Sequence, residues 1–233
     1  MNKIAIIVAG GSGTRMQTDI PKQFLPLCGQ PVLLHTVEAF IATYQAIQII
    51  LVLPKDQQAY GRELLKDKSY TKQIQIVEGG STRFASVQNG LKAINADNAQ
   101  QATVFVHDGV RCLVTPTLIR RCYDMALKTG SAIPACPATD SMRMIDKAHP
   151  TSSQAVDREN IRLVQTPQTF TYALLKKGFE QPYQDHFTDE ASVLESIGER
   201  VSLVEGDPEN IKITRPIDLI IAAAILQQRK NQA

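Results

Sequence analysis

The stretch "KIAIIVAGGSGTRMQTDIPKQF", residues 3–24, joins a short apolar run to a cluster of glycines. Residues 3–9 are apolar and rich in β-branched side chains, which predicts a strand that is buried on both faces. Gly10, Gly11 and Gly13 follow directly, so the backbone of the next turn can approach a ligand closely. The stretch therefore predicts a strand that opens into a binding loop.

Similar apolar runs alternate with helical patterns along the chain. This alternation predicts an α/β fold with three layers around a mostly parallel, Rossmann-like sheet. Ligands of such sheets bind beyond the carboxyl ends of the strands. The further expected strands are residues 48–53, 74–77 and 103–107, and the expected helices are residues 31–42, 83–94, 116–128 and 216 to about 228.

Residues 138–160 interrupt this alternation. Polar and apolar side chains alternate over residues 141–145, a turn-rich segment occupies residues 149–153, and residues 154–157 can form a second short strand. This order is typical of a hairpin. We expect a single domain over residues 1–233 with a protruding β-arm.

Composition limits the classes of function. Of the 233 residues, 43% are hydrophobic and 21% are charged, which favours a packed core over disorder. The net charge of +2 argues against a general nucleic-acid-binding face. The 4 cysteines form no C-x-x-C pair, so we expect reduced thiols in a cytoplasmic protein. The first apolar run ends in glycines and is shorter than the roughly 18 residues of a membrane span, so we expect neither a signal peptide nor a membrane partner.

The glycine loop has the chemistry of an anion site. It does not fit the dinucleotide pattern, because Thr14, Arg15 and Met16 follow Gly13, and no Gly-Lys-Ser/Thr is present for a P-loop. Backbone N–H groups in such a turn form an anion nest. Arg15 adds a planar fork and Lys22 a compact charge. A triphosphate fits this set; the alternative is a tight turn with solvent-exposed cations.

Longer motifs carry a family resemblance. "AGGSGTRM" (residues 9–16) followed by "PKQF" (residues 21–24) resembles the sugar-nucleotide pyrophosphorylase-like nucleotidyltransferases, which have the nucleotide-diphospho-sugar transferase fold. "PKQFLPLCGQPVL" narrows the resemblance to the 2-C-methyl-D-erythritol 4-phosphate cytidylyltransferases and their ribitol-phosphate relatives. Cys112 stands where this family often has proline, and Ser141 where it usually has threonine. The other motifs, in family order, are "HDGVR" (107–111), "VDR" (156–158), "TPQTF" (166–170), "TDEAS" (188–192) and "NIKIT" (210–214).

The resemblance implies transfer of a cytidylyl group from CTP to 2-C-methyl-D-erythritol 4-phosphate, with release of pyrophosphate, in non-mevalonate isoprenoid biosynthesis. Ribitol 5-phosphate is the alternative acceptor, and a non-catalytic nucleotide-binding protein is the alternative of another class. The resemblance also implies a homodimer with exchanged arms. Because Asp108 follows a predicted strand in a phosphate enzyme, we expect it to hold Mg²⁺ or another divalent cation.

Individual site residues follow from the matched motifs and from a second strand-to-helix glycine turn, "EGGSTRFAS" (78–86), where the resemblance places the cytosine base. The implied catalytic residues are Arg15, Lys22 and Lys212, the last expected on a late strand. The implied nucleotide-binding residues are Ala9, Gly10, Gly11, Gly13, Gly80, Ser86, Asp108 and Gly109. The implied polyol-binding residues are Arg111, Ser141, Arg158, Thr166 and Thr188. Structural alternatives stay open: Ser81 or Thr82 can cap a helix, Thr188 can cap another, and Asp108 can cap a turn.

Overall fold

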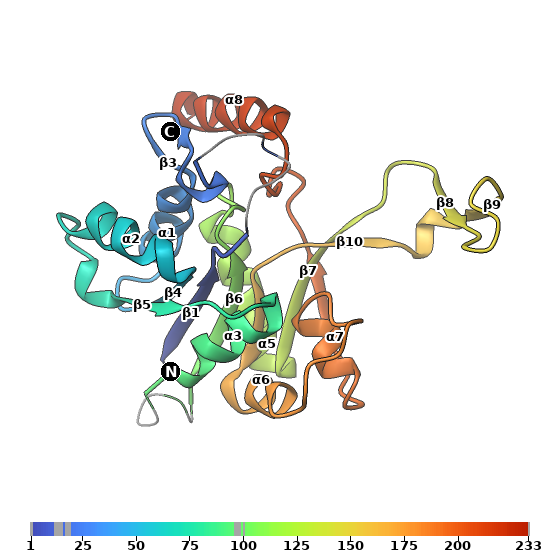
Figure 1. The fold of residues 1–233 in the computed structure, drawn as a ribbon, viewed down its shortest axis with the longest axis horizontal. Helices are drawn as coiled ribbons and strands as arrows, with labels where there is room; N and C mark the ends of the chain where they lie inside the picture. The colour runs from blue at the N-terminus through green and yellow to red at the C-terminus, as the bar shows by residue number, and fades with distance from the viewer. Residues whose placement is uncertain (1, 12–15, 17–19, 96–98, 100, 233) are drawn as a thin grey trace.

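The computed structural model describes residues 2–11, 16, 20–95, 99 and 101–232. Within these residues, one sheet of eight strands runs through the body, in the order β10-β7-β11-β6-β1-β4-β5 with β12 beside β7 (Figure 1). The strands are β1 (Lys3–Val8), β4 (Gln48–Leu53), β5 (Ile74–Glu78), β6 (Thr103–Asp108), β7 (Ser131–Pro137), β10 (Arg162–Val164), β11 (Gln168–Thr171) and β12 (Leu203–Glu205).

The four strands expected from the sequence form the parallel half of the sheet. β1 pairs in parallel with β4 on one side and with β6 on the other, and β4 pairs in parallel with β5. Along the chain, β4 and β5 follow on one side of β1, and β6 is then added on its opposite side. The point between β1 and β6 is therefore a topological switch point, where such sheets bind ligands.

The other half of the sheet is mixed, which the apolar pattern did not predict. β11 pairs antiparallel with both β6 and β7, and β10 also pairs antiparallel with β7. β12 then adds to β7 in parallel. The expected parallel pairing thus holds around β1, while β10 and β11, which follow the arm in the chain, pair antiparallel with their neighbours.

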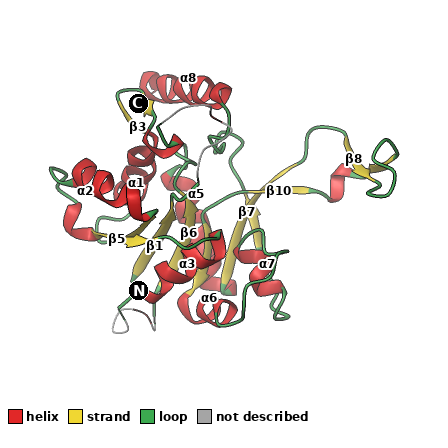
Figure 2. Cartoon of the chain, viewed as in Figure 1, coloured by secondary structure: helices red, strands yellow, loops and turns green. Residues whose placement is uncertain are grey.

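Helices cover both faces of the sheet and complete three layers (Figure 2). α1 (Val32–Thr43), α2 (Gln58–Leu65) and α5 (Pro116–Thr129) pack on one face. α3 (Arg83–Lys92), α6 (Tyr172–Phe179) and α7 (Glu190–Glu195) pack on the other. Shorter elements are η2 (Lys22–Phe24), η3 (Lys55–Gln57), η4 (Thr71–Gln73), η5 (Arg158–Asn160), β2 (Pro26–Leu27) and β3 (Gln30–Pro31).

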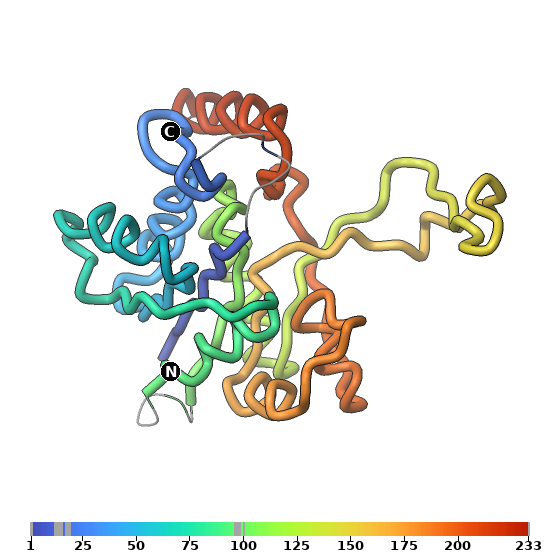
Figure 3. Tube along the Cα trace, in the orientation of Figure 1, coloured from blue at the N-terminus to red at the C-terminus, as the bar shows by residue number. Residues whose placement is uncertain are grey.

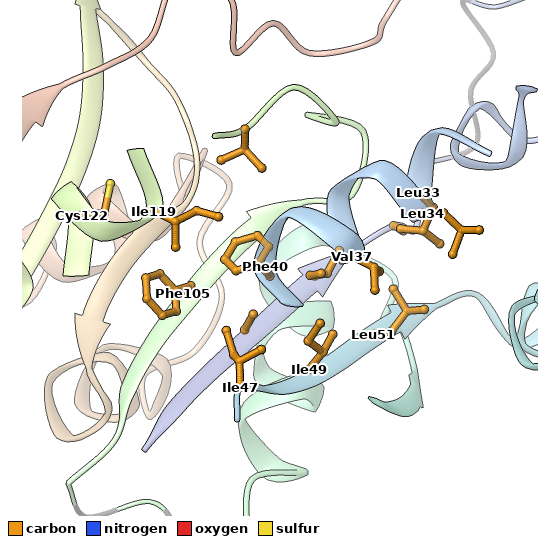
Figure 4. Close-up of a cluster of buried hydrophobic side chains, with 14 of the residues drawn as sticks. Leu33, Leu34, Val37, Phe40, Ile47, Ile49, Leu51, Phe105, Ile119 and Cys122 are labelled. Atoms are coloured by element: carbon orange, nitrogen blue, oxygen red, sulfur yellow. The ribbon is translucent and has the colours of Figure 1, made fainter. Parts of the chain in front are cut away.

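Side chains of each central strand alternate between the two layers of the core. In β1, Ala5 and Ile7 join the cluster under α1 and α5, whereas Ile4 and Ile6 join the cluster under α3 and α6. This is the two-residue period of a strand that is covered on both faces. Figure 4 shows the first cluster, in which Phe40 of α1 meets Phe105 of β6 at a ring-centroid distance of 5.7 Å.

The expected arm is present. β8 (Met142–Ile145) and β9 (Ser153–Val156) form an antiparallel hairpin that belongs to no other sheet. The hairpin extends away from the body at the end of two long chain segments (Figure 3). Its separation from the core agrees with its polar, turn-rich sequence.

The last helix, α8 (Pro216–Gln232), lies across the carboxyl-end side of the sheet (Figure 1). Asp218 accepts hydrogen bonds from the backbone N–H groups of Thr214 and Arg215, both at 2.7 Å, and so satisfies donors before the first turn. Among the described helices, none is long and apolar enough to cross a membrane.

Candidate active site

A pocket of about 220 Å³ lies at the switch point of the sheet. It is formed by the ends of β1 and β6, the residues after β1, the start of η2, the turn before α3, and the segment around Lys212. The sequence predicted a ligand site beyond the carboxyl ends of the strands, and the pocket lies there.

Lys22 brings a cation into this pocket from η2. Its residue is only 8% exposed, and its side chain runs along Gly11, where an added Cβ would lie 3.5 Å from the lysine Cε. Gly10 and Gly11 line the same wall of the pocket. Gly13 and Arg15, also predicted for this loop, lie outside the described residues.

Gln23 fixes the residue that follows β1. Its side-chain amide donates to the carbonyl of Ala9 at 2.9 Å and to Oε1 of Gln57 at 2.6 Å. The N–H of Ala9 donates to the carbonyl of Val52 at 3.0 Å. Both backbone groups of Ala9 thus have protein partners, so this pocket-lining residue is held rigidly.

The second glycine turn forms another wall of the pocket. Gly80 is required there, because an added Cβ would lie 2.4 Å from the Cβ of Ala85. Ser86 accepts a hydrogen bond from the N–H of Gly80 at 3.1 Å and donates to the carbonyl of Thr82 at 2.9 Å. Thr82 caps α3 by accepting from the N–H of Ala85 at 3.0 Å. The capping alternative therefore holds for Thr82, while Gly80 and Ser86 also line the pocket.

Asp108 ends β6 at the pocket and is surrounded by three cations. Its Oδ1 lies 3.2 Å from Nε of Arg83, and its Oδ2 lies 2.8 Å from Nζ of Lys212 and 3.7 Å from Nε of Arg111. Burial opposes ionisation of this carboxyl, but Arg83, Lys212 and Arg111 together lower its pKa well below the ordinary value. Asp108 is therefore a carboxylate at neutral pH.

Arg83 is itself held by a buried acid. Both terminal nitrogens of its guanidinium donate to the two carboxylate oxygens of Glu190, which is 1% exposed. Burial raises the pKa of the Glu190 carboxyl and the charge of Arg83 opposes that rise. The fork geometry of arginine suits this two-point contact. The result is a chain of contacts from α7 through Arg83 to the end of β6.

Lys212 reaches Asp108 from an irregular segment and not from the late strand that the sequence predicted. Ile213 packs under α8, and its N–H donates to the carbonyl of Val110 at 2.9 Å. These contacts hold the segment in place without strand pairing. The Lys212 side chain is 40% exposed. Its partner among the described residues is Asp108.

His107 and Thr166 form a buried pair beneath Asp108. The hydroxyl of Thr166 lies 3.0 Å from Nδ1 of His107 and accepts from the N–H of Asp108 at 3.1 Å. Nε2 of His107 lies 3.1 Å from the carbonyl of Arg111. Burial lowers the pKa of His107 to about 4, so the imidazole is neutral; Nε2 donates to the Arg111 carbonyl, and Nδ1 accepts a hydrogen bond from the Thr166 hydroxyl. Thr166 is 5% exposed and its hydroxyl is already used inside the protein.

Two more predicted residues lie beside the pocket without lining it. An added Cβ at Gly109 would lie 2.9 Å from the Cβ of Ala9, so this glycine permits close packing behind the β1 end. The guanidinium of Arg111 donates to the carbonyls of Asn210 at 2.9 Å and Val164 at 3.4 Å, in addition to its contact with Asp108.

The remaining predicted polyol residues lie elsewhere in the chain. Ser141 is exposed directly before β8, and Arg158 in η5 donates to the carbonyl of Thr139 at 2.7 Å. Thr188 is exposed and does not cap α7; Asp189 does so through a capping box with Ser192. In a single chain these residues do not join the pocket lining.

The chain is similar to known proteins over nearly its whole length. The family model described as 2-C-methyl-D-erythritol 4-phosphate cytidylyltransferase matches residues 3–228. The chain belongs to this cytidylyltransferase family. The enzyme of that name from Bacteroides thetaiotaomicron is 46% identical over 226 residues, which cover 97% of this chain and 100% of that protein.

Solved structures of the cytidylyltransferase family share the fold. The crystal structure of 4-diphosphocytidyl-2C-methyl-D-erythritol synthase from Anaerococcus prevotii matches with a TM-score of 0.81 and 29% identity, covering 97% of this chain and 98% of that one. The 2-C-methyl-D-erythritol 4-phosphate cytidylyltransferase from Francisella tularensis matches with a TM-score of 0.79 and 33% identity, covering 95% and 98%. The family resemblance and the fold class expected from the sequence are thereby confirmed.

Sequence reasoning missed Arg83, Glu190 and Gln23. A signal was available for Arg83, which is the first residue of α3: the positive end of a helix disfavours a cation, so an arginine there suggests an acidic partner. Glu190 stood within the "TDEAS" motif and was interpreted only as part of a helix start. Its partner is 107 residues away in the chain. No local pattern indicates such a pair.

Proposed function

We propose that this protein transfers a cytidylyl group from CTP to 2-C-methyl-D-erythritol 4-phosphate, giving 4-diphosphocytidyl-2-C-methyl-D-erythritol and pyrophosphate. The supporting observation is that a chain of this family gathers Lys22, Asp108 and Lys212 around one pocket at the switch point of its sheet. Membership in the family points to the reaction, and the pocket offers cations where phosphates would lie.

The reaction needs positioning more than acid–base chemistry. A phosphate oxygen of the polyol substrate forms a bond to the α-phosphorus of CTP, while the bond from that phosphorus to the oxygen bridging it to the β-phosphate breaks. The electron pair leaves with pyrophosphate. The attacking oxygen is already anionic, so no side chain has to remove a proton. Catalysis then depends on alignment and on stabilising negative charge in the transition state.

Lys22 and Lys212 supply that charge in this proposal. Lys22 is buried and held along the glycine loop, so its ammonium is preorganised beside the site of the α-phosphate. Lys212 is partly exposed and paired with Asp108, so it can turn from that carboxylate to a substrate phosphate. The walls at Gly80 and Ala9 would lie against the base.

A divalent cation fits the site as a companion of the nucleotide. The described residues contain no group of three or more His, Cys, Asp or Glu side chains that could cage a metal. Asp108 is one ionised carboxylate at the pocket, and Mg²⁺ is commonly held by one or two carboxylates together with substrate phosphates. When bound, Mg²⁺ would neutralise charge on the triphosphate. Lys212 would have to release Oδ2 of Asp108 to admit it.

The polyol side of the site is proposed to include residues of a second subunit. Ser141 and Arg158 belong to the arm region, which extends away from the body of the protein (Figure 1). An exchanged arm in a homodimer would carry both residues to a partner pocket, where Arg158 could fork onto the polyol phosphate.

Pyrophosphate release tests the proposal. The purified protein is incubated with CTP and Mg²⁺ together with 2-C-methyl-D-erythritol 4-phosphate, with ribitol 5-phosphate, or with neither. We expect release only with the first acceptor. Release with ribitol 5-phosphate alone would reassign the substrate, and the absence of release with either acceptor would favour a nucleotide-binding protein without transferase activity.

A further inference from the structure

The three cations around Asp108 are held in different ways. Arg111 also donates to two backbone carbonyls, and Arg83 donates with both terminal nitrogens to Glu190. Lys212 has the most exposed side chain of the three, at 40%, against 28% for Arg83 and 14% for Arg111. Two of these cations are therefore fixed, and one can move.

Glu190 is well placed to fix Arg83. It is the first residue of α7, and the start of that helix is tied to the sheet by Gln168 of β11. The Gln168 amide donates to Oδ2 of Asp189 at 2.8 Å and accepts from the N–H of Ala191 at 3.0 Å. Gln168 is 1% exposed, so this support is a rigid part of the core.

The segment before α7 is also packed against the helix that carries Arg83. The ring of Phe84, next to Arg83, lies 4.6 Å from the ring of Phe179 and 5.7 Å from the ring of Phe187. These ring contacts pack the start of α3, which carries Arg83, against the segment that leads into α7, which carries Glu190.

We propose that Glu190 is a positioning residue for cytidylyl transfer: it holds Arg83 so that the guanidinium fixes the Asp108 carboxylate while Lys212 turns to the substrate. The inference rests on the function proposed above. When Lys212 leaves Oδ2, the Arg83 contact on Oδ1 remains and keeps Asp108 ionised and oriented. Without Glu190, Arg83 loses the partner of both terminal nitrogens and its fork can rotate away from Asp108.

A double-mutant cycle in kcat tests this role. Glu190→Gln keeps the size of the side chain and removes its charge. We expect kcat to fall about 10- to 100-fold, as is usual when a residue that supports a site ligand is lost, with the KM for the polyol phosphate unchanged. In an Asp108→Asn background, the same change should lower kcat by no more than about twofold, because there is no carboxylate left to orient.

Two further variants test the same role if the Glu190→Gln protein folds poorly or if the Asp108→Asn protein has too little activity to measure. Arg83→Lys keeps a positive charge but cannot bridge both acids, so we expect the same loss in kcat. Glu190→Asp keeps the charge and should recover part of the activity. Glu199→Gln removes an ion pair with Lys177 outside the pocket and serves as the matched control, with kcat unchanged.

The outcomes separate this inference from the proposed function. If the wild type transfers cytidylyl groups and Glu190→Gln lowers only the melting temperature, with kcat per folded molecule unchanged, Glu190 is structural and the inference is wrong. Equal losses in the wild-type and Asp108→Asn backgrounds, or normal kcat in Arg83→Lys, would also overturn it. A wild-type protein without any transfer would remove the proposed function, and this inference with it.

Discussion

Lys22 is a charged residue in a nearly buried position, which is unusual because an ammonium group is costly to remove from water. Its place beside Gly11 suits stabilisation of charge that develops only as the α-phosphorus reacts. We expect Lys22→Ala to lower kcat by about 10²–10³-fold, the usual loss for one preorganised electrostatic contact. The KM for CTP should change by less than about fivefold, since the contact strengthens in the transition state.

Steady-state kinetics with varied CTP give both constants, and Lys66→Ala is the matched control. Lys66 is an exposed lysine that pairs with Glu63 at the surface, away from the pocket. A Lys22→Ala protein with normal kcat and a raised KM would show that Lys22 binds the ground state only, and the catalytic role would have to be given up.

His107 links stability to pH. Its pKa is about 4 in the folded protein because burial disfavours the imidazolium, and about 6.5 in an unfolded chain. The unfolded state therefore binds a proton that the folded state rejects, so stability falls as pH decreases from about 6.5 toward 4. Between pH 7 and pH 5 we expect this group to reduce the free energy of unfolding by about 2 kcal/mol.

Urea denaturation at pH 7, 6 and 5 measures this slope. His107→Gln can keep a donor and an acceptor but cannot titrate, so its free energy of unfolding should decline less over the interval. His186→Gln, at an exposed histidine, is the control for replacing this residue type. Equal slopes for the wild type and His107→Gln would show that the buried imidazole is not the source of the pH dependence.

At the scale of elements, the site depends on how closely the ends of β1 and β6 approach. An added Cβ at Gly109 would lie 2.9 Å from the Cβ of Ala9 and 3.0 Å from Cδ1 of Leu33, so strand and helix would have to separate. We expect Gly109→Ala to destabilise the protein by about 1–3 kcal/mol, the usual cost of overpacking. Gly10→Ala is the matched control for stability, because its Cβ would meet nothing within 4 Å.

Thermal or urea unfolding of both variants is the measurement. If Gly109→Ala is as stable as the wild type, the β1–β6 junction has room to relax, and close packing does not explain the glycine. A loss of stability in Gly10→Ala of equal size would point to backbone entropy as the common cause instead of the steric contact.

Local pattern was sufficient for most elements and failed where partners are distant. The four central strands were predicted within one residue at each end, because burial on both faces leaves a continuous apolar run. In the "NIKIT" segment, residues 210–214, polar and apolar side chains alternate as they do in many strands. Ile213 packs under α8, but the segment pairs with no described strand and is irregular. Alternation reports which side chains are buried, and pairing decides whether the segment is a strand.

The site was predictable to a similar degree. Gly10, Gly11, Lys22, Asp108 and Lys212 were placed together from motifs, and they do line one pocket. The sequence assigned Thr166 a substrate hydroxyl contact, but the fold uses that hydroxyl between His107 and the N–H of Asp108. Such contacts join the end of β6 to the segment before β11 across 58 residues of chain, so they depend on the tertiary fold and have no local signature.

At the scale of the whole molecule, the arm and the strand after it expose apolar side chains that the described residues leave uncovered. Met144 and Ile145 on β8 are 65% and 55% exposed, and Leu163 and Val164 on β10 are 51% and 41% exposed. Apolar surface gathered on a projecting hairpin and its adjoining strand favours association with another chain. A two-fold dimer with exchanged arms would cover this surface and bring Arg158 to a partner's pocket.

Subunit mixing tests whether the site is shared. Lys22→Ala removes a cation from the pocket, and Arg158→Ala removes the proposed arm contact, so each homodimer should be nearly inactive. In a shared-site dimer, a mixed pair has one site with both defects and one site with neither. With random pairing about half of the dimers are mixed, so about a quarter of wild-type activity should return after the two variants are unfolded and refolded together.

If each site is built by one chain, every site in the mixture keeps one defect and activity stays low. Native mass spectrometry establishes that heterodimers are present, and a mixture that contains them without regaining activity would contradict the shared site.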